Sequence, residues 1–580
     1  MKPRLLLLTM LAFITALLAF RLKEKIRPKN LPDNFRAYRE KNIVRCSPNW
    51  NELKEWMEET DIPPIPGAGN YKWKISTKSD SAQFYFNQGI NTYYSFHIIE
   101  SMASFKKAAK LDPDCAMTYW AQALAYGPNI NDAGYAASPD ALSASAKAME
   151  LSANCTNKEK MLIQSQQVRY STDSTAAREK LNQLYVDKMK EAYAKFPADA
   201  DVAALYADAL MLQHPWDLWR TDGTPKLWTP LIRSVLEKLL AKAPNHPGAN
   251  HYYIHVMEAS PFAYKAIPSA DRMGKLTPGL SHTVHMPSHI YLRTGNYNKG
   301  VTVNEAALKS FNSTIPLYEP VTGGAFLYSI HNLHMQTNNA MLAGRSAYSS
   351  GSAIATANSI PSDYLFAPGA LGNLVQYVYM IPTLVDVRFG NWGQLLLNPE
   401  PDAKQIYGTV LYHFGRGMAL AHQSRLAEAK HELEQIQQAK SDSNLYIPFT
   451  PFSAAIEGVI VAEHLLSGTI ALAEKRFDDA IISFQKAVTK EENMIYDEPR
   501  DWLLNPKHYL GDAYIKAGRL TEAKNILQKD LLNNNENGWA LFGLWQVLNA
   551  EKKKVEADKM LLRFRKAFEK SDIKLYGPVF

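Results

Sequence analysis

The chain has 580 residues, of which 46% are hydrophobic and 21% charged, and its formal net charge is +7. This composition excludes an intrinsically disordered chain, and the length allows several ordinary domains or one long repeat protein. Residues 1–30 hold seven basic residues against Glu24 alone, a surplus of six that leaves about +1 for the rest of the chain. No nucleic-acid-binding surface is therefore predicted.

The N-terminus carries an uncharged apolar run, residues 5–20, preceded by Lys2 and Arg4. A basic start followed by an apolar stretch is typical of a secretory signal. The tripeptide Leu17-Leu18-Ala19 is a weak cleavage site, so residues 1–30 are either a signal peptide or a membrane anchor. We expect an exported protein of the cell envelope, periplasmic or membrane-anchored, that meets the membrane through this segment only.

Residues 31–80 read as an irregular lead-in, because the stretch around residues 61–73 is rich in proline and glycine. The chain has three cysteines, Cys46, Cys115 and Cys155. An exported chain could pair Cys115 with Cys155, and the alternative is free, partly buried thiols. No CxxC motif occurs, which excludes a sulfur-rich zinc or redox motif.

From about residue 81 onward, apolar residues recur at spacings of three and four, which predicts helices. Small and large residues recur at fixed offsets within successive helical hairpins. Those offsets are met by Gly89, Phe105, Ala108 and Pro113; Gly417, Ala429 and Leu433; Gly468, Ala480, Phe484 and Ala487; and Leu510, Gly511, Tyr514, Ala523 and Leu527. Small residues let two helices approach closely, and large ones fill the space between them.

On these residues, the chain resembles the tetratricopeptide-repeat superfamily, exported bacterial type, over most of residues 81–570. The resemblance implies an all-α solenoid of about twelve helix-turn-helix hairpins with insertions. We divide it into N-terminal repeats, residues 81–329, which include most of the histidine cluster described below, and C-terminal repeats, residues 330–580.

Two insertions interrupt the repeats, at residues 213–228 and 312–329. The first contains Trp216, Trp219 and Trp228. Because insertions in solenoids often emerge on the binding face, these tryptophans could form a lid over a groove. Local packing as a small separate core is the alternative.

The histidines repeat with the period of the structure. His251 and His255 are four residues apart, and His285 and His289 follow one 34-residue step later. A third unit carries His331 and His334, and His282 occupies the repeat position of His331. In the resembled family, these positions lie on the first helix of each hairpin and point into the concave groove, so the resemblance implies that seven histidines face one cavity. Pro287 should kink this helix or delay its start.

Converging imidazoles favour a metal site that would take copper, zinc or iron. His251, His255, His285 and His289 are the expected core ligands, with His334, His331 and His282 extending the site toward a second ion. Six histidines match the ligand count of a coupled two-copper site, by analogy of number only. Glu258 is a candidate ligand or catalytic general base. The alternatives are a structural hydrogen-bonded ladder, a site for an anionic peptide or carboxylate, and an aromatic wall.

No HExxH motif, phosphate-binding loop, GxSxG elbow or dinucleotide fingerprint occurs. We therefore expect a repeat scaffold whose groove binds a protein or peptide partner, or a small-molecule substrate, through a histidine-rich, metal-loaded site. A metalloenzyme, oxidative or hydrolytic, is the first alternative. A pure protein-interaction scaffold is the second.

Overall fold

A computed structural model describes residues 48 and 50–580, except 132–134, 136, 174, 319, 321–324 and 449–451. The apolar N-terminal segment, residues 5–20, and Cys46 lie outside the described residues. The chain divides into two compact units, Met1–Ile43 and Val44–Phe580, and every feature below belongs to the second unit.

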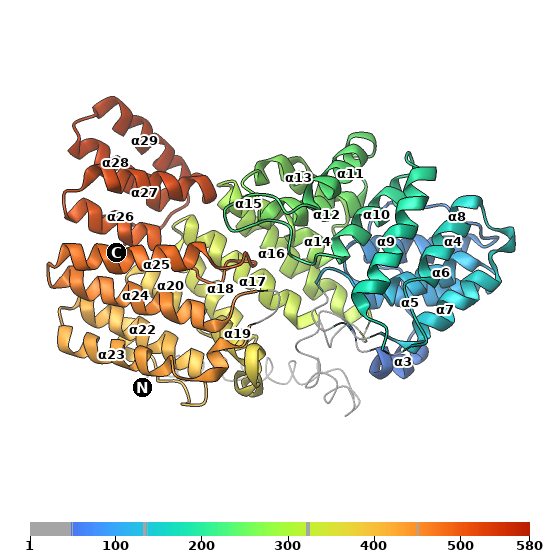
Figure 1. Cartoon of the computed structure of the whole chain (residues 1–580), viewed down its shortest axis with the longest axis horizontal. Coiled ribbons are helices and arrows are strands. Elements are labelled where there is room, and N and C mark those ends of the chain that lie inside the picture. The colour runs from blue at the N-terminus through green and yellow to red at the C-terminus, as the bar shows by residue number, and fades with distance from the viewer. Residues whose placement is uncertain are drawn as a thin grey trace, which may run out of the picture. The chain divides into compact units, whose positions relative to one another are not determined.

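The described residues form helices joined by turns and loops, and they contain no β-strand beyond two isolated bridges (Figure 1). The first helices are α3 (Trp50–Glu59), α4 (Asp80–Tyr94), α5 (Ile98–Leu111), α6 (Ala116–Ala125), α7 (Pro139–Glu150), α8 (Asn157–Gln167), α9 (Arg178–Lys195), α10 (Ala200–Leu212) and α11 (Thr229–Lys242). The central helices are α12 (Pro247–Glu258), α13 (Ile267–Leu276), α14 (Ser281–His285), α15 (Pro287–Arg293), α16 (Tyr297–Thr314), α17 (Ala325–Leu342) and α18 (Ser346–Asn358). The last are α19 (Gly369–Tyr379), α20 (Ile381–Phe389), α21 (Trp392–Leu397), α22 (Ile406–His422), α23 (Leu426–Ala439), α24 (Ala455–Ala473), α25 (Phe477–Glu492), α26 (Pro506–Lys516), α27 (Leu520–Asn533), α28 (Gly538–Ala550) and α29 (Lys554–Ala567). Short 3-10 turns lie at Ser152–Asn154, Ala263–Ala266, Ile315–Leu317, Ser362–Phe366 and Ser443–Tyr446.

Taken in order from α4, these helices pair into twelve consecutive hairpins within the described residues, with α14–α15 and α19–α20 each serving as one broken helix. The predicted all-α repeat fold is confirmed. The lead-in contains helix α3 before its irregular stretch, and the two cysteines within the described residues, Cys115 and Cys155, are free thiols.

The repeat residues lie where two helices of a hairpin touch. A Cβ added at Gly89 would come within 2.3 Å of the Phe105 ring, and one at Gly468 within 2.5 Å of the Phe484 ring. A Cβ added at Gly511 would likewise lie 2.7 Å from the Leu527 side chain. Gly417 differs, because its nearest side chain is Leu466 of the next hairpin. The small residues therefore permit the close helix approach that the sequence pattern predicted.

The C-terminal hairpins contact the central ones, although they are far apart in the chain. The hydroxyl of Tyr297, at the start of α16, donates to the carbonyl of Asn535, and Asn535 Nδ2 donates to the carbonyl of Arg293. The indole of Trp539 donates to the carbonyl of Met341. In an ideal solenoid each repeat touches only its neighbours. These contacts bring residues near position 500 to the histidine-bearing helices.

Helix α24 is, among the described residues, the one long and apolar enough to cross a membrane by length and composition. Two thirds of its most apolar window, 67%, is buried. It packs against α22 and α25, where its apolar residues form part of the hydrophobic core.

The glycine contacts give a first prediction. Gly89→Ala should destabilise the protein by about 1–3 kcal/mol, because the new methyl group overlaps the fully buried Phe105 ring. The matched control is Gly274→Ala in α13, where no atom lies within 4 Å of the new methyl group and the higher helix propensity of alanine should stabilise slightly. Thermal unfolding followed by circular dichroism measures both. Equal melting temperatures for the two variants would contradict the packing assignment.

Candidate metal site

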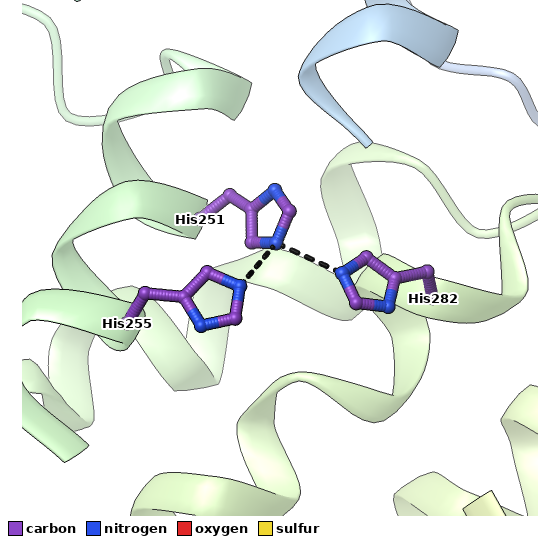
Figure 2. A group of neighbouring side chains, drawn as sticks. All are labelled: His251, His255 and His282. Atoms are coloured by element: carbon purple, nitrogen blue, oxygen red, sulfur yellow. Dashed lines mark hydrogen bonds between the residues drawn. The ribbon is translucent and has the colours of Figure 1, made fainter. Parts of the chain in front are cut away.

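Three imidazoles meet between α12 and α14. His251 Nε2 lies 3.0 Å from His255 Nε2 and 3.1 Å from His282 Nε2 (Figure 2). All three side chains point inward and are almost completely buried. We call this group the first triad.

A second triad joins α14, α15 and α17. His285 Nε2 lies 3.2 Å from His289 Nε2, and the His331 ring lies 4.7 Å from the His285 ring between centroids. A nitrogen of each residue lies within 4.8 Å of one from each of the others. The side chain of His331 is 27% exposed, so this triad has one edge open to solvent.

The interruption at Pro287 lies within the second triad, between His285 on α14 and His289 on α15. Helix α14 ends at His285 and α15 begins at Pro287, as expected for a proline that cannot continue the hydrogen-bond ladder. His282 contacts the imidazoles of α12, whereas His289 contacts His331 of α17. The sequence pattern predicted one core of four histidines, and the structure instead arranges two groups of three, with His282 as a full member of the first.

Glu258 connects the triads from the end of α12. Its Oε1 is hydrogen-bonded to His255 Nδ1 at 2.9 Å, and its Oε2 lies 2.8 Å from His289 Nδ1. Glu498 lies beside it, with Oε2 3.3 Å from His289 Nδ1, and the two carboxyl groups are hydrogen-bonded to each other. Burial raises the pKa of Glu258 to about 8; burial and the charge of Glu258 raise the pKa of Glu498 to about 8. The pair therefore shares a proton near neutral pH.

The hydrogen-bond partners fix the tautomers of the imidazoles. His251 Nδ1 lies 2.7 Å from the carbonyl oxygen of Tyr94, which only accepts, so this nitrogen carries the proton. His255 Nδ1 lies 2.9 Å from Glu258 Oε1 and donates to it when Glu258 is ionised. In the neutral ring, the Nε2 atoms of both residues then carry lone pairs, and they face each other at 3.0 Å.

Two lone pairs that face each other repel, so this arrangement requires a positively charged group between the two nitrogens. Burial lowers the pKa of His251, His282 and His285 well below the usual range, so a proton is held poorly there. Imidazole nitrogens bound to one transition-metal ion at about 2.0–2.1 Å are separated by roughly 2.9–3.4 Å when the angle at the metal is near 90–110°. The observed separations of 3.0, 3.1 and 3.2 Å match this spacing.

The structure sets His334 apart from both triads. It lies one turn beyond His331 on α17, and its ring lies 6.2 Å from that of Tyr377. Its Nε2 is buried without a hydrogen-bond partner among the described residues. Burial lowers the pKa of His334 to about 3.

Glu498 was missed by the sequence analysis, which weighed only residues within the repeat pattern. It lies in the loop between α25 and α26, more than 160 residues along the chain from every histidine of the two triads. The only available signal was the acidic, proline-containing stretch Asp497–Asp501, which departs from the short turn of a regular hairpin.

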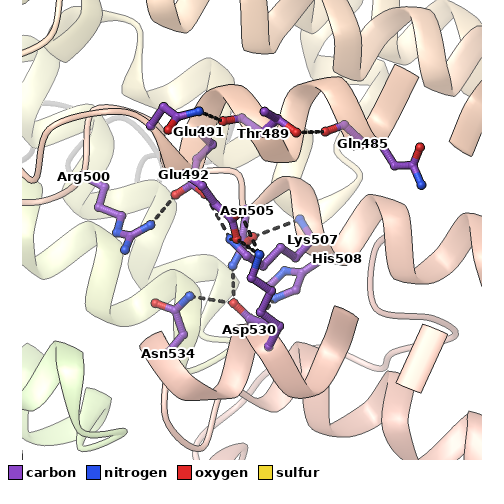
Figure 3. A network of polar contacts seen from close by, with 12 residues as sticks. Gln485, Thr489, Glu491, Glu492, Arg500, Asn505, Lys507, His508, Asp530 and Asn534 are labelled. Carbon is purple, nitrogen blue, oxygen red and sulfur yellow. Dashed lines mark hydrogen bonds and ion pairs between the residues drawn. The ribbon is translucent and has the colours of Figure 1, made fainter. Parts of the chain in front are cut away.

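A buried polar network anchors this loop (Figure 3). The guanidinium of Arg500 contacts the carboxylate of Glu491 at the end of α25, and Lys507 Nζ of α26 lies 3.2 Å from the same carboxylate. His508 Nε2 lies 2.9 Å from an oxygen of Asp530 on α27. Because each buried charge has an opposite partner, the network holds the backbone on both sides of Glu498.

The three tryptophans of the insertion at residues 213–228 adopt both of the expected arrangements. The Trp216 ring packs edge-on against the His255 ring, 5.4 Å away, and covers the first triad. The other two pack locally: Trp228 stacks on His214, and the Trp219 indole donates to the carbonyl of Val256.

Comparison with known proteins finds similarity only among solved structures, and that similarity is low. No protein-family profile matches the chain, and no curated protein matches it. Among solved structures, the human IFIT1 dimer with m7Gppp-AAAA is 11% identical, with 90% of this chain and 100% of that chain covered and a TM-score of 0.32. The Cut9-Hcn1 structure of the APC/C is 13% identical, with 84% of this chain and 73% of that chain covered and a TM-score of 0.28. The P58(IPK) TPR domain is 12% identical, with 77% of this chain and 99% of that chain covered and a TM-score of 0.21. Similarity this low carries no functional argument.

The position of His334 gives a prediction about pH. Its pKa is lower in the folded than in the unfolded state, so the unfolded state binds more protons and stability is lost as pH falls below about 6.5. His334→Leu should remove on the order of 2 kcal/mol of this loss at pH 5. Melting temperatures of variant and wild type at pH 7.5 and pH 5 measure the effect. The variant should keep its full metal content, and a loss of metal would return His334 to the site.

Proposed function

We propose that this protein binds two transition-metal ions, one in each histidine triad. The facing Nε2 lone pairs of His251 and His255, 3.0 Å apart, carry the proposal. The first ion would be held by His251, His255 and His282, and the second by His285, His289 and His331. Glu258 orients one imidazole of each triad, a role that carboxylates commonly have around histidine-bound metals.

The donor set limits the choice of metal. Imidazole nitrogens suit copper, zinc, iron and nickel, and copper(II) is the tightest binder of these ions. Neutral imidazoles and an interior with few charges also exclude hard ions such as calcium, which require oxygen ligands. Export to the cell envelope is part of the same proposal and rests on the N-terminal apolar segment.

The two triads predict a stoichiometry that can be tested. The purified full-length chain, reconstituted with copper or zinc and desalted, should hold two equivalents of metal by elemental analysis. His282→Gln should reduce this to one, and so should His331→Gln, because each variant loses a ligand of only one triad. The double variant should hold none.

Matched controls separate ligation from misfolding. His431→Gln removes a histidine whose side chain is 67% exposed and should leave two equivalents. Circular dichroism checks that every variant is folded. If the wild type binds no metal after reconstitution, or if the double variant is folded and keeps its metal, the proposal is wrong.

A metalloenzyme is the second candidate, and the ligand count supports it. Three protein ligands for each ion leave a coordination position for a small molecule, whereas structural zinc sites use four. The open edge at His331 gives access, and the carboxyl pair Glu258 and Glu498 lies close enough to move a proton. A protein partner would have no direct contact with the buried imidazoles, so a small molecule is the better-supported ligand.

The open position gives a further prediction. Azide added to the copper-loaded protein should bind at the metal and produce a ligand-to-metal charge-transfer band, with saturation. His331→Gln, which retains only the buried first triad covered by Trp216, should lose most of the band although it still holds one equivalent of metal. An absorption spectrum that azide does not change would indicate closed sites and would contradict the enzyme candidate.

A further inference from the structure

A small cavity lies beside the metal site, between α19 and the loop that carries Glu498. Its volume is about 40 Å³, enough for about three groups of the size of a water molecule. Its lining includes Tyr377, Tyr407, Phe452, Gly458, Asp497 and Asp501. Nothing in the metal proposal uses these residues.

The polar end of the cavity is acidic. Asp497 and Asp501 are hydrogen-bonded to each other, and Asp497 also accepts a hydrogen bond from the backbone N–H of Glu498 at 2.7 Å. The Oδ2 atom of Asp501 is buried and has no hydrogen-bond partner among the described residues. Two adjacent carboxyl groups with an unused oxygen favour a positively charged partner.

The walls are aromatic. Tyr377 is 5% exposed, and its buried hydroxyl is hydrogen-bonded to the backbone of Leu503. The Tyr407 ring is stacked on it, with centroids 5.9 Å apart. Gly458 leaves the space for Tyr407, because a Cβ there would lie 2.1 Å from the Tyr407 hydroxyl. A phenol can make more than one hydrogen bond, so the Tyr377 hydroxyl can also bind a polar ligand group at this wall.

We infer that this cavity binds the ammonium group of a short-chain primary amine. A primary ammonium has three N–H donors, and Asp501 Oδ2, the Asp497 carboxyl group and the Tyr377 hydroxyl oxygen are three acceptors. The rings of Tyr377, Tyr407 and Phe452 add cation–π attraction and enclose the short alkyl chain.

The cavity is continuous with the first triad through aromatic contacts. Phe452 packs on Trp216 with centroids 5.7 Å apart, and Trp216 packs on His255. On the other side of the cavity, the Asp497 carboxyl group accepts a hydrogen bond from the backbone N–H of Glu498. An amine held here would lie next to the proposed metal centre as a substrate or an effector. Binding itself does not depend on the metal, so the inference stands on its own observations.

Propylammonium is the probe, because it is a short-chain primary amine that carries a single positive charge. Isothermal titration with the metal-free full-length chain should show saturable binding of propylammonium and none of 1-propanol, which lacks the charge. Tetramethylammonium, which has the charge but no N–H donor, should bind at least about tenfold more weakly. The same titration with the metal-loaded chain shows whether the two sites interact.

Two variants test the residues. Asp501→Asn keeps the shape of the side chain and should weaken propylammonium binding at least about tenfold, and Tyr377→Phe keeps the ring and should weaken it about threefold or more. The matched control is Asp478→Asn on α25, whose side chain is 90% exposed. Both cavity variants should keep two equivalents of metal, which separates a failure of this inference from a failure of the proposed function.

Three outcomes would overturn the inference. One is the absence of saturable propylammonium binding to the folded wild type. A second is equal binding by wild type and Asp501→Asn. The third is calcium binding that depends on Asp501 and that propylammonium does not compete with, which would assign the cavity to a hard cation.

Discussion

The site depends on one buried carboxylate, Glu258, whose two oxygens hold imidazoles from two different repeat units. His255 donates to one oxygen, and His289 contacts the other. Burying a carboxylate away from water is costly unless hydrogen-bond donors contact its oxygens. Glu258 therefore requires the two imidazoles, and its position in turn fixes the orientation of their rings. Both rings direct Nδ1 toward Glu258, and their Nε2 atoms point away from it into the two triads.

Burial of the histidine cluster favours the same neutral form of imidazole that metal binding requires. Charged imidazolium is disfavoured in the interior, and the pKa values of His251, His282 and His285 are lowered accordingly. Neutral imidazole is also the form that binds metal. The protein interior therefore keeps the ligands in their binding form, while Trp216 covers one triad and His331 opens the other.

The repeat architecture accounts for the histidine-bearing helices but not for the complete site. A solenoid places equivalent positions of successive repeats side by side, which explains why residues 34 apart in the sequence meet. Glu498 and the acidic cavity come from the far end of the chain, held by Arg500, Glu491 and Lys507 and by the contacts of Tyr297 with Asn535. This closure converts an exposed surface of the repeats into an interior.

The sequence by itself determined the helical hairpins, because small and large residues recur where two helices must touch, and it determined which histidines come together, because they follow the same period. It also located Glu258 and the break at Pro287. Only the tertiary structure decided that the histidines divide into two triads, that His334 is excluded, and that Glu498, Asp497, Asp501 and Tyr377 lie nearby. The reason is physical: periodicity encodes contacts between neighbouring repeats, whereas contacts across more than 200 residues depend on how the whole chain packs and leave no local pattern.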